Sequence, residues 1–184
     1  MKRTHWLSYA YLRFCSKPSV ERVIFRAIAR QKARRFVEIG MGEVRRGPRM
    51  LAVANRFHPI EALCYTGIDL FDTRTEYQAP LSLKSAHRTL RPLAGKVHLV
   101  PGEPYAALSH CANRLVHSDV ILINSSLDDE RMKPAWFYFP RMLHRNTQVF
   151  LVDGEGEDIQ LTPMDHETIQ QRASSSPTLI RTAA

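Results

Sequence analysis

The sequence contains few cysteines, and they do not form pairs. Cys15, Cys64 and Cys111 are an odd number, widely spaced among 184 residues, and no C-x-x-C pair occurs. This pattern excludes a disulfide framework and is typical of a reducing compartment. The chain also lacks an uninterrupted apolar run of membrane-spanning length, because Arg13 interrupts the apolar stretch near the N-terminus and no small-residue cleavage site follows. We therefore expect a cytoplasmic protein with no membrane partner.

Metal-ligand patterns and internal repeats are also missing. None of the eight histidines stands in an H-x-x-x-H or H-x-H pair, so we expect no metal site. The contents of 44% hydrophobic and 24% charged residues are those of an ordinary globular domain. The one excess is positive charge, because 26 Lys and Arg outnumber 18 Asp and Glu and leave a net charge of +8. This bias favours acidic partners such as nucleic acid, anionic lipid or anionic substrates.

Apolar periodicity divides most of the chain into alternating helices and strands. Apolar residues recur at helical spacing between Ser19 and Arg34, which predicts an amphipathic helix with Ser19 as its cap. The β-prone run 35–39 follows and ends at Gly40 and Gly42. Further strands are predicted at 64–68, 97–100, 120–123 and 148–152, with helices at 49–57, 82–90, 104–115 and 129–143 between them.

This alternation predicts an α/β fold with a doubly wound parallel sheet in three layers, preceded by the amphipathic helix. The strand at 36–39 should lie near the centre of the sheet. We divide the chain into an N-terminal segment at 1–18, a ligand-binding domain at 19–153 and a polar C-terminal tail at 154–184. Weak order is expected in the tail, where 159–161 and 178–180 are the alternatives for short edge strands.

Small and acidic residues follow three of the predicted strands. Ligands of an open parallel sheet bind outside the carboxyl ends of its strands. Gly40 and Gly42 would let the backbone approach a ligand, and Asp69 could accept hydrogen bonds from a ribose diol. Glu103 could accept a bond from an adenine amino group beside Tyr105. The alternatives are ordinary turn glycines, a helix-capping or solvated Asp69, and a Glu103 that complements a helix N-terminus.

Taken in order, these segments resemble the class I S-adenosylmethionine-dependent methyltransferases. The resemblance covers roughly residues 20–153 and lies in the segments 37–42, 67–70, 102–103 and 119–123. It implies a Rossmann-like fold and S-adenosylmethionine as cofactor and binding partner. It also implies that Glu38 and the loop from Gly40 to Gly42 hold the methionine part, that Asp69 holds the ribose hydroxyls and that Glu103 meets the adenine edge.

A nicotinamide-dinucleotide enzyme is the nearest competing interpretation, because that fold also places glycines and an acid after its first two strands. Glu38 and Glu43 disfavour an anionic pyrophosphate and suit a cationic sulfonium and ammonium. Arg45 also occupies the third position of a G-x-G-x-x-G pattern. The sequence therefore favours S-adenosylmethionine.

The chain departs from the family at two further places. Val44 stands where the family often has another glycine. Asn124 stands where metal-dependent catechol-type methyltransferases have an aspartate ligand, so we expect methyl transfer without magnesium. The segment 124–127 shares only its first residue with the motif of methyltransferases that act on nucleotide bases. The acceptor and catalytic residues are thus undefined, and a non-catalytic methyltransferase-like binding protein is the alternative function.

Two clusters are interpreted structurally. Arg22, Arg26, Arg30 and Arg34 fall at successive i+4 positions, and a solvated helix face is favoured over a phosphate-binding stripe. Nucleic acid is therefore a partner that we do not favour. The aromatic run 136–139 is assigned to helix and core packing, with an acceptor pocket as the alternative.

Overall fold

The centre of the protein is a six-stranded sheet. The computed structural model describes residues 6–42, 44–76, 78–125, 129–154 and 158–176. The strand order is β3-β2-β1-β4-β5-β6, so β1 lies inside the sheet as predicted. The first five strands are parallel and β6 is antiparallel to β5. The strands are β1 (Arg35–Ile39), β2 (Cys64–Asp69), β3 (Lys96–Pro101), β4 (Val120–Asn124), β5 (Gln148–Asp153) and β6 (Gln160–Met164).

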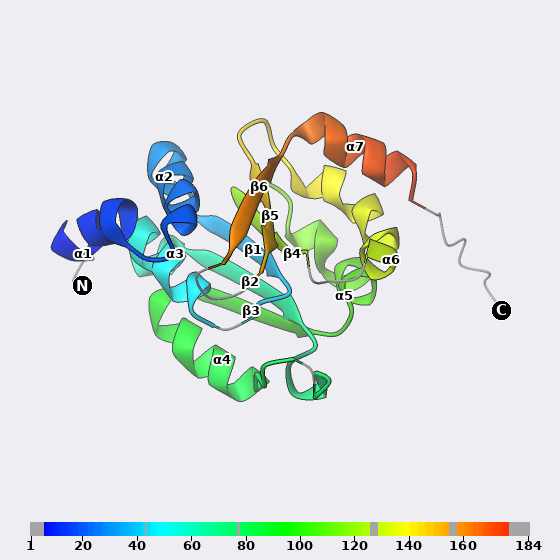
Figure 1. Cartoon of the computed structure of the whole chain (residues 1–184), viewed down its shortest axis with the longest axis horizontal. Coiled ribbons are helices and arrows are strands. Elements are labelled where there is room, and N and C mark those ends of the chain that lie inside the picture. The colour runs from blue at the N-terminus through cyan, green and yellow to red at the C-terminus, as the bar shows by residue number, and fades with distance from the viewer. Residues whose placement is uncertain (1–5, 43, 77, 126–128, 155–157, 177–184) are drawn as a thin grey trace.

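Helices cover both faces of this sheet (Figure 1). The α-helices are α1 (Trp6–Ala10), α2 (Arg22–Gln31), α3 (Arg46–Asn55), α4 (Leu83–Leu90), α5 (Pro104–Cys111), α6 (Asp129–Met132) and α7 (His166–Ser174). The remaining helical segments are the π-helical η1 (Tyr11–Cys15) and the 3₁₀ segments η2 (Ser19–Glu21), η3 (Ile60–Ala62), η4 (Phe71–Thr73), η5 (Arg91–Leu93), η6 (Ala112–Arg114) and η7 (Pro134–Met142). The predicted three-layer doubly wound fold is confirmed.

Strand β1 shows how the two layers of helices are held. Successive side chains of a strand point to opposite faces of the sheet. Phe36 packs in the core shared with α2, α3 and α4, whereas Val37 and Ile39 pack in the core shared with α5, η7 and α7. Because both faces are covered, β1 is buried almost along its whole length.

The predicted cap of the first amphipathic helix is wrong. Residues 19–21 form the turn η2, and α2 begins only at Arg22, without a side-chain cap from Ser19. The chain turns in this way because Glu21 points inward and receives hydrogen bonds from Arg46 and Arg49 of α3. Helix α2 ends at Gln31, where Lys32 adopts a left-handed conformation with φ of 52°.

The expected weak order of the tail is also wrong for residues 158–176. Strand β6 pairs with β5, and α7 begins with a cap in which the Asp165 carboxylate accepts the Thr168 N–H at 2.6 Å. Ile169 of α7 is fully buried, and Arg172 lies over the ring of Trp136 at 5.0 Å. The edge strand predicted at 159–161 thus corresponds to the start of β6, while 178–180 lies outside the described residues.

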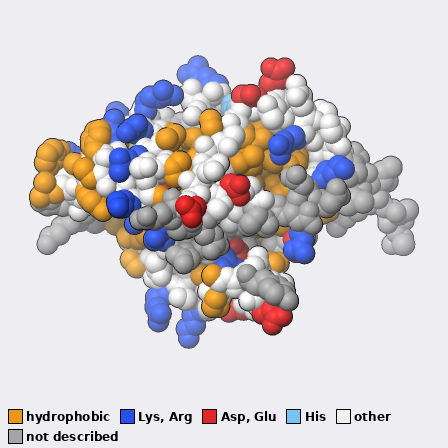
Figure 2. Space-filling view, viewed as in Figure 1, with side chains coloured by type: hydrophobic (Ala, Val, Ile, Leu, Met, Phe, Trp, Pro, Cys, Tyr) orange, Lys and Arg blue, Asp and Glu red, His pale blue; other side chains and the backbone are white. Residues whose placement is uncertain are grey.

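The surface carries one apolar end and broad basic areas (Figure 2). Hydrophobic side chains gather at the end formed by α1 and η1, where Trp6, Leu7, Tyr11 and Phe14 are each more than half exposed. Lys and Arg side chains gather over α2 and α4. Within the described residues, no helix combines the length and apolar character needed to cross a bilayer.

Candidate functional site

The loop after β1 turns sharply at two glycines. Gly40 and Gly42 have φ angles of 74° and 56°, in the left-handed region that glycine enters without strain. A Cβ atom on Gly42 would meet no heavy atom within 4 Å, so the space beside this residue is open. Between the glycines, the Met41 side chain is buried and its N–H points toward Asp69. The loop is thus shaped for a close approach by a ligand.

Asp69 ends β2 directly beside this loop, as predicted. Its Oδ2 atom accepts the Met41 N–H at 2.7 Å, and its Oδ1 atom accepts the Phe71 N–H at 3.0 Å. The guanidinium of Arg74 donates to both oxygens, each time at 2.7 Å. A carboxylate has about four lone-pair positions, so all of them are used.

Arg74 is the residue at this site that sequence reasoning missed. Its Nη2 atom also donates to the Gly42 carbonyl at 2.9 Å, and its Nη1 atom donates to the Ala79 carbonyl. The side chain is only 6% exposed. Arg74 therefore joins the loop after β2 to the loop after β1. A cation five residues after Asp69 was the only signal in the sequence.

The charge of Asp69 is stabilised by these contacts. Burial by itself would raise its pKa, but the hydrogen bonds from Arg74 and from the N–H groups of Phe71 and Met41 outweigh burial. The pKa of Asp69 therefore lies below its usual value of 3.8.

Glu38 lies beneath the glycine loop and not at its open side. It is 2% exposed and belongs to the face of β1 that carries Phe36. Its Oε1 atom accepts a bond from Arg46 at 3.0 Å, and its Oε2 atom accepts the Tyr65 hydroxyl at 2.5 Å. Burial raises the pKa of Glu38 although Arg46 and Tyr65 lower it, and burial together with Glu38 raises the pKa of Tyr65 well above 10.0.

The Glu38 contacts continue into a buried ionic network. Arg46 also donates to Glu21 at 3.2 Å, and Arg49 donates to Glu21 at 3.0 Å. This network fastens α3 to β1 and to the turn before α2. Because Arg46 compensates the charge of Glu38, Glu38 by itself does not repel an anionic pyrophosphate. Glu43, the other acid in that argument, lies outside the described residues.

Glu103 stands at the N-cap position of α5, although its side chain makes no capping hydrogen bond. Its Oε1 atom accepts a bond from Arg131 at 3.1 Å. Its Oε2 atom is buried and has no hydrogen-bond partner among the described residues. The preceding Gly102 has a φ of 129° and open space where a Cβ would stand. Tyr105 packs against Tyr138, with 5.7 Å between the ring centroids.

The end of β4 carries Asn124, as the sequence indicates. The next residue, Ser125, donates its hydroxyl to Asp153 at the end of β5, at 2.7 Å. Ser126 and Leu127 lie outside the described residues. In the part of the chain that the structure describes, no three His, Cys, Asp or Glu side chains are grouped to hold a metal ion.

Aromatic residues of η7 divide between the core and the surface. Trp136 and Phe139 are buried, in agreement with the predicted core packing. Phe137 is 42% exposed, and the guanidinium of Arg141 lies over its ring and over that of Tyr138.

Comparison with solved structures identifies the fold. A structure described as a protein-L-isoaspartate O-methyltransferase of Plasmodium falciparum, in complex with S-adenosyl-L-homocysteine, aligns with 80% of this chain and 65% of its own, at 15% identity and a TM-score of 0.50. The O-methyltransferase TomG of Streptomyces achromogenes, in complex with S-adenosylmethionine, aligns with 79% of this chain and 64% of its own, at the same identity and TM-score. The chain thus spans slightly less than two thirds of each.

The fold is that of the class I S-adenosylmethionine-dependent methyltransferases. No protein-family model matches the chain. Comparison with curated protein sequences also gives no match. The similarity therefore lies in the three-dimensional arrangement. Whether the residues at the carboxyl ends of β1, β2 and β3 suit a cofactor has to be decided from their own geometry.

These residues fit S-adenosylmethionine on two counts and need one rearrangement. The open space beside Gly42 and Gly102 leaves room for a ligand, and the partnerless oxygen of Glu103 offers an acceptor for an amino group. Asp69 can accept ribose hydroxyls only if Arg74 gives up part of its contacts, because every lone pair of the carboxylate is used.

Proposed function

We propose that the chain is an S-adenosylmethionine-dependent methyltransferase whose cofactor binds at the carboxyl edge of β1, β2 and β3. The main observation that supports this proposal is that the glycine loop contacts Asp69. The Met41 N–H in this loop donates a hydrogen bond of 2.7 Å to the Asp69 carboxylate. Strand β2, which ends in Asp69, lies between β1, which is followed by Gly40, and β3, which is followed two residues later by Glu103. One ligand of nucleoside size can therefore reach all three positions.

In this proposal each residue has a positioning role. Gly40 and Gly42 leave room for the methionine part, and Glu38 supports their loop through Arg46 and Tyr65. Asp69 accepts the ribose hydroxyls, and the free oxygen of Glu103 accepts the adenine amino group. These residues lie within the proposed cofactor domain at 19–153.

The bound cofactor supplies a methyl group on a sulfonium, which is electrophilic without further activation. A nucleophilic acceptor then needs mainly orientation, so the reaction does not require a general base from this chain. We propose that the acceptor is a small molecule or an exposed group of a macromolecule.

A non-catalytic methyltransferase-like binding protein is the second candidate. The closed pair of Arg74 and Asp69 favours it, because a site that has lost its cofactor can keep its carboxylate satisfied internally. The two candidates differ in whether the cofactor can displace Arg74.

Calorimetry with S-adenosylmethionine and S-adenosylhomocysteine on the parent and on Arg74→Gln tests this difference. If Arg74 competes with ribose for Asp69, its removal should tighten binding about tenfold, since a hydrogen bond to a charged group is worth roughly 1.5–3 kcal/mol. Arg88→Gln removes the same charge from an exposed position of α4 and should leave binding unchanged.

Two results would contradict the methyltransferase proposal. The first is that neither S-adenosylmethionine nor S-adenosylhomocysteine binds the parent or Arg74→Gln. The second is that substitutions of Asp69 leave the binding of both compounds unchanged. Circular dichroism of each variant verifies that the fold is retained. Either result would make the binding-protein candidate the better one.

A further inference from the structure

A large cavity lies at the opposite edge of the sheet from the proposed cofactor site. Its volume is about 1180 Å³, and its lining includes the first residues of β1, β2 and β3 together with parts of α4 and η6. Small-molecule sites commonly occupy roughly 300–1,000 Å³, so the cavity has room for one organic ligand. The basic lining residues are Arg34, Arg35, Lys84, His87, Lys96, His98 and Arg114, and Glu61 is the one carboxylate in the lining.

The strand register places two of these cations in one row. Arg35 of β1 stands beside Cys64 of β2, and Cys64 stands beside Lys96 of β3. These three residues share a face of the sheet, and two residues further along Thr66 stands beside His98 on that same face. Burial raises the pKa of Cys64 while Arg35 and Lys96 lower it, so both cations act on the centre of the row.

The same face of the sheet also carries the apolar residues Val37 and Val100, and Leu115 follows η6. Arg114 of η6 belongs to the lining as well; burial raises the pKa of Cys111, and the charge of Arg114 lowers it in part. The cavity lining thus combines apolar and basic side chains.

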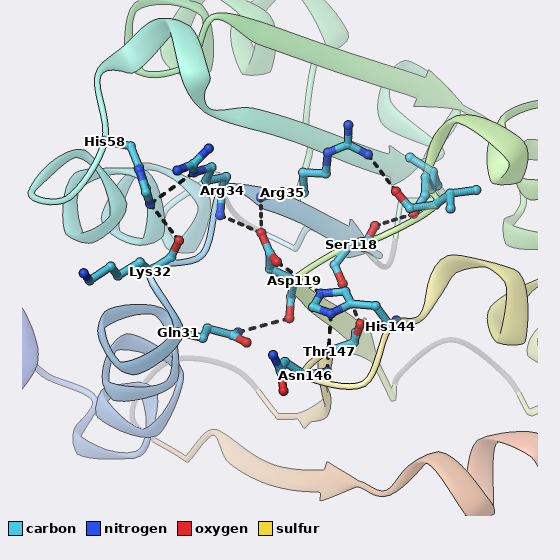
Figure 3. Close-up of polar contacts among 12 residues, drawn as sticks. Gln31, Lys32, Arg34, Arg35, His58, Ser118, Asp119, His144, Asn146 and Thr147 are labelled. Atoms are coloured by element: carbon cyan, nitrogen blue, oxygen red, sulfur yellow. Dashed lines mark hydrogen bonds and ion pairs between the residues drawn. The ribbon is translucent and has the colours of Figure 1, made fainter.

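Asp119, the half-buried acid just before β4, is already engaged with the backbone (Figure 3). Asp119 accepts the N–H groups of Arg34 and Arg35 at 2.7 and 2.9 Å, and its other oxygen faces the ring of His144 at 3.1 Å. The Arg35 guanidinium donates to the carbonyl of Val116 at 2.7 Å, which fixes its position without neutralising it.

Lys96 and Arg114 are both exposed, and no carboxylate of the described residues lies within ion-pair distance of either. Clustered cations without carboxylate partners favour an anionic ligand, because they repel one another until an anion binds.

We propose that this cavity is a second binding site, for a small organic phosphate. The phosphate lies between Lys96, Arg35 and Arg114, and the organic part lies against Val37 and Val100. Because the site is at the amino edge of the sheet, it is separate from the carboxyl edge that contains Asp69, and it does not depend on the proposed methyltransferase function.

Calorimetry with phenyl phosphate tests the proposal, because this probe has no nucleoside that could enter the cofactor site. The double variant K96Q/R114Q should bind phenyl phosphate at least about tenfold more weakly than the parent, given the usual worth of hydrogen bonds to charged groups. The matched control R26Q/R30Q removes two exposed charges from α2, outside the cavity lining, and should bind like the parent.

Backbone amide NMR locates the bound probe. Shifts confined to Cys64, Thr66, His98 and their neighbours would support the proposal. It would be overturned if the parent does not bind phenyl phosphate, if both double variants weaken binding equally, or if the shifts centre on Asp69. Tighter binding of inorganic phosphate or of a single-stranded oligonucleotide than of phenyl phosphate would also overturn the assignment to a small organic phosphate.

Discussion

At the residue scale, the state of Asp69 decides how the carboxyl edge can work. The carboxylate stands where the strand pattern places it, yet Arg74 occupies two of its acceptor positions. In the proposed function, cofactor binding at Asp69 would therefore exchange one set of hydrogen bonds for another. The net gain in binding free energy is then smaller than for a carboxylate without internal partners. Substitutions of Asp69 and of Arg74 should therefore change cofactor affinity in opposite directions.

Asp69→Ala should weaken S-adenosylmethionine binding about ten- to a hundredfold, because the ribose hydroxyls lose a charged acceptor worth roughly 1.5–3 kcal/mol per bond. Asp72→Ala is the comparison. Asp72 is exposed and accepts the Leu83 N–H at 3.1 Å, so its loss affects the start of α4 and not the ribose position. Calorimetry on both variants makes the measurement, and equal affinities for both and the parent would remove the ribose role of Asp69.

Asp69 should also contribute to stability in a pH-dependent way. Its pKa in the folded state lies below 3.8, so its contribution is present above that value and is lost as the pH falls through the folded pKa. Asp69→Asn leaves Arg74 without its buried partner and should cost about 2–3 kcal/mol near neutral pH, somewhat less than a fully buried pair. Urea unfolding of both proteins between about pH 7 and pH 3 should show the difference shrinking toward low pH.

Glu38→Gln provides the opposite case. The pKa of Glu38 is raised above 4.5 by burial, so ionising it costs stability as the pH rises from that value through the folded pKa. The free energy of unfolding of the parent, minus that of Glu38→Gln, should therefore fall as the pH rises. The corresponding difference between the parent and Asp69→Asn should rise. Two differences that change in the same direction would contradict the assigned pKa shifts.

At the scale of elements, the prolines and the C-terminal segment account for the differences from expectation. The helix predicted at 129–143 is divided into α6 and the 3₁₀ turns of η7, because Pro134 and Pro140 cannot continue an α-helix. The polar composition after Asp153 indicated weak order, but α7 needs only one buried apolar anchor, Ile169, to pack beside η7. A short helix with a single anchor has no strong periodic signal.

Ile169→Ala should lower the free energy of unfolding by about 2–4 kcal/mol, as for other fully buried aliphatic side chains. The neighbouring Gln170 is exposed, and Gln170→Ala should change stability by less than about 0.5 kcal/mol. Urea unfolding of the three proteins makes the comparison. If Ile169→Ala unfolds like the parent, α7 is not part of the cooperative core.

At the scale of the whole molecule, the net charge of +8 is not concentrated along one helix. Within the predicted arginine stripe, Arg22 donates to the Ser16 carbonyl at 2.9 Å, and Arg34 lies beyond the end of α2. Arg26 and Arg30 are exposed. These four arginines therefore do not form one continuous stripe, and their charge attracts polyanions without defining a complementary surface.

Binding to duplex DNA should consequently be weak and strongly dependent on salt. Fluorescence anisotropy at about 50 and 200 mM salt should show that the affinity falls by several factors of ten. Counterion release requires this loss when several phosphates are neutralised. The R26Q/R30Q variant should reduce the affinity equally for unrelated sequences. Tight, sequence-selective binding at the higher salt concentration would instead indicate a specific nucleic-acid partner.

The sequence by itself determined the order of strands and helices, the central position of β1 and the three strand ends at Gly40, Asp69 and Glu103. These features depend on local periodicity and on glycine, which act over a few residues. Only the tertiary structure decided that Arg74 closes on Asp69, that Arg46 and Tyr65 hold Glu38, and that the cations at 35, 96 and 114 meet in one cavity. Such pairings join residues of different segments, and their free energy depends on distance and burial in space, which no local pattern records.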